Sequence, residues 1–348
     1  MSFLYRKLVR RLLFAMSPEL AHNTAIRSAA VLQNFELANV ITRFLSKAKD
    51  FPVAAAGLKF KNPVGLAAGF DKDCEAPKFL SRLGFGFLEL GTVTLRPQNG
   101  NPKPRLFRVN EKKALINRMG FNNAGACQAA RSLARLLPLD IPVGINIGKN
   151  ADCPLADAPK NYLEAVRILY PYGDYFAINI SSPNTLQLRE LHQKEKLERL
   201  LDPLAEFGAG QKIKKTFFIK ISPDLETTEL ESVVSTAVKR GFGLIAANTT
   251  VRREGLPPRW KNHEGGLSGK PLKTLADETL KKTAALAARR VPIMGVGGVS
   301  DGRSAVEKLR LGADLVQIYS GLIYEGPFLV KAILEYMDKA GYPCSHLK

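Results

Sequence analysis

The sequence of 348 residues is poor in the side chains that build metal centres and disulfides. It contains four cysteines and four histidines, and neither a C-x-x-C nor an H-E-x-x-H motif occurs among them. This composition predicts no metal site and no disulfide framework. Free cysteines are typical of proteins in a reducing compartment.

Long hydrophobic runs are also missing. No run reaches the roughly eighteen apolar residues that a membrane-spanning helix needs. Residues 1–16 show neither the apolar core nor the cleavage site of a signal peptide, and the missing Arg- and Ser-rich transit segment favours a bacterial over a mitochondrial protein. The segment Gly266-Leu-Ser-Gly-Lys270 lacks one glycine of the nucleophile-elbow motif, which argues against a serine hydrolase.

Acidic residues are scarce relative to basic ones, with 32 Asp and Glu against 51 Lys and Arg and a net charge of +19. Nucleic acid, an anionic membrane surface, an anionic substrate or a merely basic soluble surface would each explain this excess. Charge alone does not distinguish them.

The sequence does contain eight short apolar runs separated by helix-like stretches. Strands of a parallel sheet are buried on both faces and read as such runs. Eight strand–helix units that close on themselves form a (β/α)8 TIM barrel, an α/β fold whose active site lies at the carboxyl ends of the strands. We therefore predict a barrel domain over residues 51–348, with long loops at 94–108, 181–196 and 252–270. The runs span residues 64–72, 87–92, 143–146, 176–179, 217–220, 244–248, 293–298 and 315–320.

Residues 1–50 precede the barrel and follow a helical pattern. Ser17-Pro18-Glu19 predicts the start of a second helix, and a third is expected over Glu36–Ser46. This extension is either a helical cap over the barrel floor or an amphipathic membrane-facing module, and a cationic stripe opposite leucines favours the module. The first helix places apolar residues every four positions and basic residues opposite them: Leu4, Leu8, Leu12 and Met16 against Arg6, Lys7, Arg10 and Arg11.

Glycine-rich turns follow the last two predicted strands, at Gly295-Val-Gly-Gly298 and Tyr319-Ser-Gly321. In barrels these turns often hold a phosphate against helix N-termini. The G-x-G-G spacing, with no acid about twenty residues on, excludes a dinucleotide-binding fingerprint. We predict a phosphate-bearing ligand here, with plain tight turns as the alternative.

Amide side chains and two lysines gather near the predicted strand ends. Amides offer donors and acceptors without charge, which suits the edge of a heterocycle, although a single loop asparagine is usually a turn residue. Lys72 and Lys220 are costly to bury unless they meet an anion, which a structural ion pair, an anionic cofactor ring or a substrate carboxylate would each supply. The amides are Asn117, Asn122, Asn123, Asn146, Asn179, Asn184 and Asn248.

Seven strings in one order together closely resemble the dihydroorotate dehydrogenases, from about Pro52 to the last barrel helix. The serine at Ser182 and the N-terminal helices resemble the quinone-dependent, membrane-associated class. The soluble class has a cysteine base, and residues 179–185 contain none. The strings are Ala67-Ala-Gly-Phe-Asp-Lys72, Gly91-Thr-Val-Thr94, Ile116-Asn-Arg-Met-Gly-Phe-Asn-Asn123, Asn179-Ile-Ser-Ser-Pro-Asn-Thr185, Asn248-Thr-Thr250, Gly265-Gly-Leu-Ser-Gly-Lys-Pro-Leu272 and Gly295-Val-Gly-Gly298.

The resemblance implies that the protein binds FMN, oxidises dihydroorotate to orotate and passes the electrons to a quinone in de novo pyrimidine biosynthesis. Lys220 would face the polar edge of the flavin ring, while Gly298, Tyr319 and Ser320 would take its phosphate. Ala247 departs from the pattern, because many relatives carry threonine there and the hydroxyl contact is lost. The implied flavin contacts are Ala68, Gly69, Phe70, Asp71, Lys72, Thr92, Asn146, Asn179, Lys220, Ala247, Gly269, Gly298, Tyr319 and Ser320.

The resemblance also implies a substrate site and a base. Serine is a weak base at neutral pH, so Ser182 needs a relay for the proton, expected through Thr185 and water under Phe121. These three residues are the expected catalytic set. The implied contacts to the substrate ring and its carboxylate are Lys72, Asn117, Arg118, Met119, Gly120, Phe121, Asn179, Asn184, Asn248 and Thr249.

His22 and Arg108 match positions that line the quinone tunnel of this class, and residues 1–50 would form its apolar mouth. An ordinary capping contact is the alternative for His22. The implied partners are ubiquinone or menaquinone and an anionic membrane surface, without nucleic acid. A peripheral membrane protein on the cytoplasmic face of the bacterial inner membrane is therefore expected.

Two other functions fit parts of the sequence. A flavin barrel that acts on RNA uracil, similar to a dihydrouridine synthase, would explain the net charge and would bind tRNA in a salt-dependent way. The complete string Asn179–Thr185 and the lack of an appended RNA-binding domain argue against it. A non-catalytic phosphate-binding barrel that serves as a membrane scaffold would be favoured by a purified protein that takes up no FMN.

Overall fold

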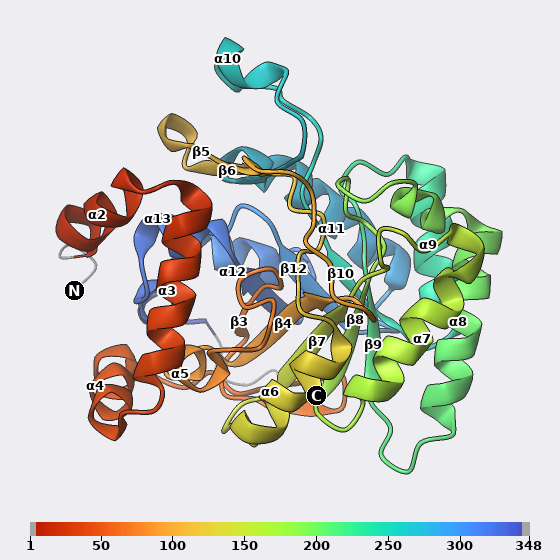
Figure 1. Ribbon diagram of the computed structural model, residues 1–348, viewed down its shortest axis with the longest axis horizontal. Coiled ribbons are helices and arrows are strands. Elements are labelled where there is room, and N and C mark those ends of the chain that lie inside the picture. The colour runs from red at the N-terminus through yellow and green to blue at the C-terminus, as the bar shows by residue number, and fades with distance from the viewer. Residues whose placement is uncertain (1–4, 343–348) are drawn as a thin grey trace.

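The computed structural model describes residues 5–342, and a closed barrel of eight parallel strands forms its centre (Figure 1). Around the barrel the order is β3-β4-β7-β8-β9-β10-β12-β13, and β13 pairs with β3 to close it. Every predicted apolar run coincides with one of these strands, which confirms the predicted (β/α)8 barrel. The strands are β3 (Val64–Leu66), β4 (Phe87–Val93), β7 (Val143–Ile147), β8 (Tyr175–Asn179), β9 (Thr216–Lys220), β10 (Gly243–Ala246), β12 (Ile293–Val296) and β13 (Leu315–Ile318).

Helices surround the barrel and pack on it through one apolar face. In α8 (Lys194–Ala209), buried leucines at Leu197, Leu200, Leu201 and Leu204 follow the spacing that places side chains on one side of a helix. The other helices after barrel strands are α5 (Pro77–Ser81), α6 (Ala126–Leu136), α7 (Ala158–Leu169), α9 (Thr227–Lys239), α11 (Lys273–Ala287), α12 (Gly302–Arg310), α13 (Ser320–Glu325) and α14 (Leu329–Lys339).

A β-hairpin closes the amino-terminal end of the barrel. Its strands, β1 (Val53–Ala55) and β2 (Leu58–Phe60), pair antiparallel, and the Phe60 ring meets the Phe87 ring edge-on at 5.3 Å. Together with Tyr175 and Phe218, these rings fill the lower barrel interior. The sequence pattern does not predict this hairpin. The hairpin, and not the amino-terminal helices, therefore fills the centre of the barrel floor.

The amino-terminal helices lie beside the barrel (Figure 1). A π-helical turn (Tyr5–Val9) leads into α2 (Arg10–Ala15), α3 (Pro18–Leu32) and α4 (Glu36–Ser46), and α3 packs on α5. The predicted starts of the second and third helices are confirmed, although Ser17 makes no side-chain capping hydrogen bond. Leu4 of the predicted first stripe lies outside the described residues.

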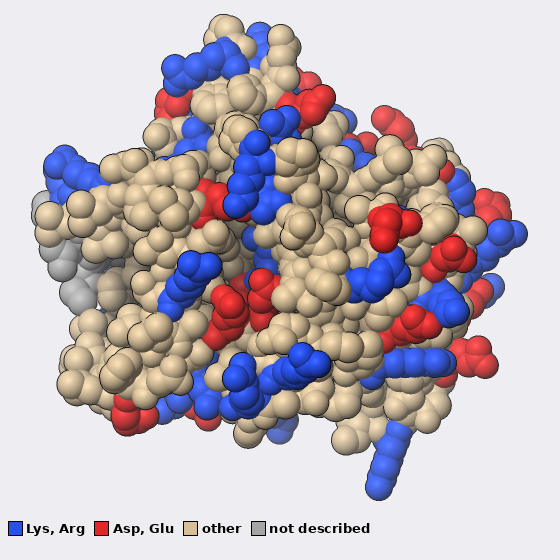
Figure 2. Space-filling model, viewed as in Figure 1, with Lys and Arg blue, Asp and Glu red and all other residues tan. Residues whose placement is uncertain are grey.

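The outer face of these helices is apolar. Leu12, Leu37 and Phe44 are 72%, 73% and 75% exposed. Figure 2 shows that the surface over α3 and α4 carries few charged atoms. Within residues 5–342, no helix combines the length and hydrophobicity needed to cross a bilayer.

Part of the basic stripe fastens the first helical turns to the barrel. The acceptors all belong to α13, so the extension is attached to the last strand–helix unit. Two cations of the stripe, Arg6 and Arg10, therefore take part in packing against the barrel. The contacts are Tyr5 hydroxyl to the Ile323 carbonyl at 2.8 Å, Arg10 Nη1 to the Tyr324 carbonyl at 2.8 Å, and the ion pair of Arg6 Nη1 with Glu325 Oε2 at 3.5 Å.

Two of the long loops contribute to a small antiparallel sheet. In it, β6 (Ala114–Asn117) lies between β5 (Leu106–Val109) and β11 (Gly266–Gly269). The short helix α10 (Pro258–Lys261) precedes β11 and projects from the molecule (Figure 1). This sheet, which the sequence pattern does not predict, forms one wall above the barrel.

Candidate active site

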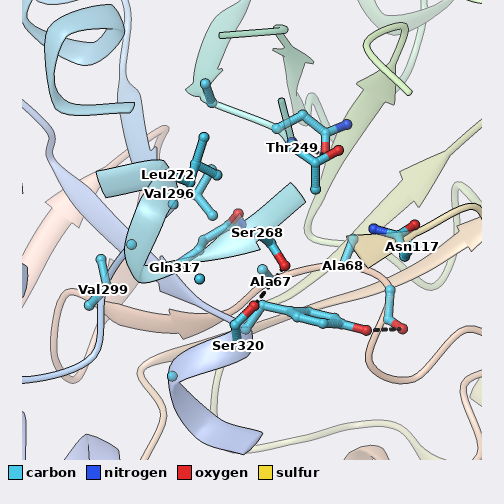
Figure 3. A pocket seen from close by; sticks show the side chains of 18 of the residues that line it. Ala67, Ala68, Asn117, Thr249, Ser268, Leu272, Val296, Val299, Gln317 and Ser320 are labelled. Carbon is cyan, nitrogen blue, oxygen red and sulfur yellow. Dashed lines mark hydrogen bonds between the residues drawn. The ribbon is translucent and has the colours of Figure 1, made fainter. Parts of the chain in front are cut away.

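A cavity at the carboxyl ends of the barrel strands brings together most of the predicted ligand-binding residues (Figure 3). Lys72 follows β3, Ser182 follows β8, and Lys220 ends β9, yet all three line this one cavity. The predicted residues along its wall are Ala68, Gly69, Lys72, Thr92, Asn117, Met119, Gly120, Phe121, Asn179, Ser182, Asn184, Lys220, Ala247, Asn248, Thr249, Gly269, Gly298, Tyr319 and Ser320.

Hydrogen bonds connect the amide side chains of the cavity. Asn179 Nδ2 donates to Asn146 Oδ1 at 3.1 Å and to Thr92 Oγ1 at 3.3 Å, and the Thr92 hydroxyl donates to Asn146 Oδ1 at 2.6 Å. Asn184 Nδ2 donates to Asn117 Oδ1 at 3.2 Å. Such mutual contacts hold donors and acceptors in fixed directions before a ligand arrives.

Lys72 places an ammonium on the cavity wall. Among residues 5–342, no hydrogen bond or ion pair of its ammonium is present, and the side chain is partly buried. Burial lowers the pKa of Lys72 to about 8, although the carboxylates of Asp73 and Glu19 act in the opposite direction. An unpaired ammonium in this position fits an anionic ligand.

Hydroxyl groups and glycines form the other end of the cavity. The Ser268 and Ser320 hydroxyls point toward one another, 2.8 Å apart (Figure 3). Gly297 and Gly298 adopt left-handed φ angles of 101° and 75°, a region that favours glycine. Lys270 adds a positive charge to the lining. These donors are the kind that hold a phosphate.

Ser182 and Phe121 lie on the wall near the amides. The Ser182 hydroxyl is buried and accepts a hydrogen bond from the Asn184 N–H at 3.2 Å. Phe121 is also buried, with a left-handed φ of 52°. Thr185 does not line the cavity, but its hydroxyl is buried and has no hydrogen-bond partner among the residues that the structure describes.

Other predicted contact residues lie behind or beside the wall. The Asp71 carboxylate accepts the backbone N–H groups of Glu75 and Ala76, both at 2.9 Å, and so shapes the loop after β3. Burial raises the pKa of Asp71 to about 6. Arg118 instead donates to the Pro104 carbonyl at 3.0 Å. The predicted residues that do not line the cavity are Phe70, Asp71, Arg118, Asn146 and Thr185.

A second cavity lies between the amino-terminal helices and the barrel, and His22 and Arg108 both line it. The Arg108 guanidinium donates to the Leu13, Phe14 and Met16 carbonyls at 3.1, 3.2 and 2.9 Å. Carbonyls at the end of a helix lack partners within it, so Arg108 completes the end of α2. The remaining wall is mostly apolar, with contributions from α3 and α5.

Two aromatic rings separate the cavities. The His22 ring meets Phe70 edge-on at 5.5 Å, and Phe70 meets Tyr319 at 5.9 Å. Tyr319 lines both cavities. Burial lowers the pKa of His22 to about 3, and the positive charge of Lys72 acts in the same direction. The second cavity therefore presents a neutral imidazole.

Several polar residues of this region do not emerge from the sequence analysis, among them Lys270, Ser268, Gln317 and Glu89. Ser268 and Gln317 line the first cavity, and Glu89 lies beneath it in an ion pair with Lys220 at 3.3 Å. The structural ion pair left open for the two lysines thus exists for Lys220. An acid or amide inside an otherwise apolar strand is the sequence signal that could have identified Glu89 and Gln317.

The chain is similar to known proteins in sequence and in structure. A family model for dihydroorotate dehydrogenase matches residues 50–340. The chain belongs to the dihydroorotate dehydrogenase family.

Relatives in this family resemble the chain over nearly its whole length. A dihydroorotate dehydrogenase (quinone) of Delftia acidovorans is 45% identical, covering 95% of this chain and 97% of its own. The protein of the same name from Thermus thermophilus is 46% identical and covers 94% of each chain. A crystal structure of the Eimeria tenella dihydroorotate dehydrogenase in complex with ferulenol superposes with a TM-score of 0.85 at 32% identity, covering 95% of this chain and 96% of that one.

Proposed function

We propose that the protein oxidises dihydroorotate to orotate and transfers the electrons to a quinone, as a step of de novo pyrimidine biosynthesis. The near-full-length similarity to enzymes named for this reaction carries the proposal. The cavity supports it, because Lys72, Ser182 and Lys220 lie around one space at the barrel mouth, where barrel enzymes hold their active sites.

The family is flavin-dependent, and FMN is the flavin proposed for this chain. The donor set fits FMN at both ends of the cavity. Gln317 Oε1 is a buried acceptor without a partner among residues 5–342, and Lys220 lies beside it, which suits the mixed polar edge of the ring. Ser320, Gly298 and the neighbouring backbone N–H groups suit the phosphate. When bound, FMN accepts a hydride from the substrate. Asp71 and Asn146 would support the flavin site from behind, and Ala247 can offer only backbone atoms.

The substrate would lie against the amide-rich wall. Asn117, Asn184, Asn248 and Thr249 offer neutral donors and acceptors to the ring, and Lys72 offers its unpaired charge to the carboxylate. Phe70 and Arg118 were predicted as direct contacts, but their place outside the cavity wall suits supporting roles.

Ser182 would take the proton that leaves the substrate carbon. Its hydroxyl is too weak a base to hold that proton, so the proton must pass on. The buried hydroxyl of Thr185, which has no hydrogen-bond partner within residues 5–342, is the next group proposed on this path, with Phe121 shielding it from solvent.

The second cavity would admit the quinone. Its apolar wall, its neutral His22 and the exposed apolar face of the helices over residues 5–46 suit a lipid-soluble acceptor that arrives from a membrane surface. We place the protein at the cytoplasmic face of the inner membrane, bound to anionic lipid through its exposed basic residues and without a nucleic acid partner.

Anaerobic addition of dihydroorotate to the purified, flavin-loaded protein tests this function. The visible flavin absorption should bleach, and a quinone should restore it. A flavin that stays oxidised at saturating substrate would contradict the proposed reaction. Bleaching without recovery on quinone addition would contradict only the proposed acceptor.

A further inference from the structure

Glu89 lies inside the barrel, below the first cavity and in the middle of β4. Side chains alternate along a strand, so its neighbours Leu88 and Leu90 pack outward with the helices while Glu89 faces the barrel axis. Its exposed fraction is 0%. A carboxylate in such a place is costly unless charged or polar partners surround it.

Four donors from four other strands meet this carboxylate. Asn146 Nδ2 and Lys220 Nζ donate to Oε1 at 2.8 and 3.3 Å. Gln317 Nε2 and the Tyr175 hydroxyl donate to Oε2 at 2.6 and 3.4 Å. Of these four donors only Lys220 is a cation, and its side chain is 5% exposed. Glu89 and Lys220 therefore form a closely matched pair of opposite charges in the barrel interior.

Lys220 and Gln317 line the cavity, whereas Glu89 does not, so Glu89 holds these two side chains and does not itself contact a ligand there. We infer that Glu89 is a positioning residue that fixes Lys220 beneath the flavin and offsets its charge there. This inference rests on the proposed function, in which Lys220 faces the polar edge of the ring. Reduction adds negative charge to that edge, so an ammonium without its carboxylate favours the reduced flavin more strongly.

The test is the midpoint potential of the flavin in the holoenzyme, compared between the parent and Glu89→Gln. The substitution keeps the shape and removes the charge. We expect the ratio of affinities for reduced and oxidised flavin to rise at least about tenfold, which is a shift of about 30 mV to higher potential for a two-electron couple. Combining Glu89→Gln with Lys220→Gln should give a smaller shift relative to Lys220→Gln alone, because the part of the effect that Glu89 exerts by placing Lys220 and offsetting its charge is then absent.

Tyr175→Phe is the matched control, because it removes the longest hydrogen bond to the same carboxylate without changing charge. Its potential should equal that of the parent. If Glu89→Gln does not retain flavin, Glu89→Asp is measured in its place. The shorter side chain moves the carboxylate away from Lys220, so the midpoint potential should rise by less than in Glu89→Gln. A potential equal to or below the parental one in the flavin-loaded variant would overturn the inference. A parent protein that holds flavin but is not bleached by dihydroorotate would overturn the proposed function instead.

Discussion

The two cavities of this protein are built from different parts and offer different chemistry. The first is formed by strand ends and the loops above them, and hydrogen bonds join its polar side chains to one another. The second lies where helices meet the barrel, and its two predicted polar residues are either neutral or engaged with helix carbonyls. The strand ends thus position polar groups in the first cavity. The space between the helices and the barrel forms an apolar second cavity, and the rings of Phe70 and Tyr319 lie between the two.

The largest effect is expected for Ser182, the proposed catalytic base, and should be confined to the half-reaction of the first cavity. Ser182→Ala should slow flavin reduction by dihydroorotate by about 10²–10⁴-fold, because the proton then has no acceptor. Flavin content and reoxidation by quinone should stay at parental values, because both depend on other residues. Stopped-flow absorbance under anaerobic conditions measures both half-reactions. Flavin reduction at the parental rate would show that another residue is the base.

The pH dependence of orotate binding tests whether the first cavity binds an anion through Lys72. Since the pKa of Lys72 is lowered to about 8, its ammonium is mostly charged at pH 7 and loses its proton as the pH rises through 8. Affinity for orotate should therefore fall above pH 8, by about tenfold per pH unit. Titration calorimetry or flavin absorbance follows the binding. In Lys72→Arg, whose guanidinium keeps its charge, the fall should be absent.

Filling the second cavity should affect only the quinone half-reaction. Ala25 lines it, so Ala25→Phe should reduce quinone-dependent turnover roughly tenfold, the size of a moderate overpacking penalty. Flavin reduction by dihydroorotate should be unchanged. Ser28→Phe adds the same ring on the exposed side of α3 and serves as the control. Equal losses in both half-reactions would remove the functional distinction between the cavities.

The smallest effect is expected at His22. With a pKa of about 3, its imidazole stays neutral between pH 5 and 8. The rate of the quinone half-reaction should therefore have the same pH dependence in this range in the parent and in His22→Gln. A step near pH 6 that the substitution removes would show that His22 is charged during turnover.

The barrel could be predicted because each strand is a local apolar run that is buried on both faces. The hairpin over residues 53–60 and the β5-β6-β11 sheet could not, because β1, β2 and β5 are only partly buried and β11 pairs with a segment far away in the sequence. The helical pattern of residues 5–16 indicates which positions share a face, but not that Arg10 binds the barrel.

The candidate site shows a similar division. Lysines and asparagines that follow the apolar runs stand out in the sequence, and the structure places them around one cavity. Glu89 and Gln317 lie within the apolar runs and are therefore assigned to strands and not to a site. Only the closed barrel brings Gln317 Nε2 to 2.6 Å from Glu89 Oε2. Depth below a cavity is a property of the closed fold and has no local signal.

The attachment of the first helical turns to α13 has a structural consequence. This short helix begins at Ser320 beside the glycine turns, follows Tyr319 at the boundary of both cavities, and ends on the carbonyls and carboxylate that hold residues 5–10. The same short helix therefore carries both the contacts of residues 5–10 and Ser320 in the wall of the first cavity.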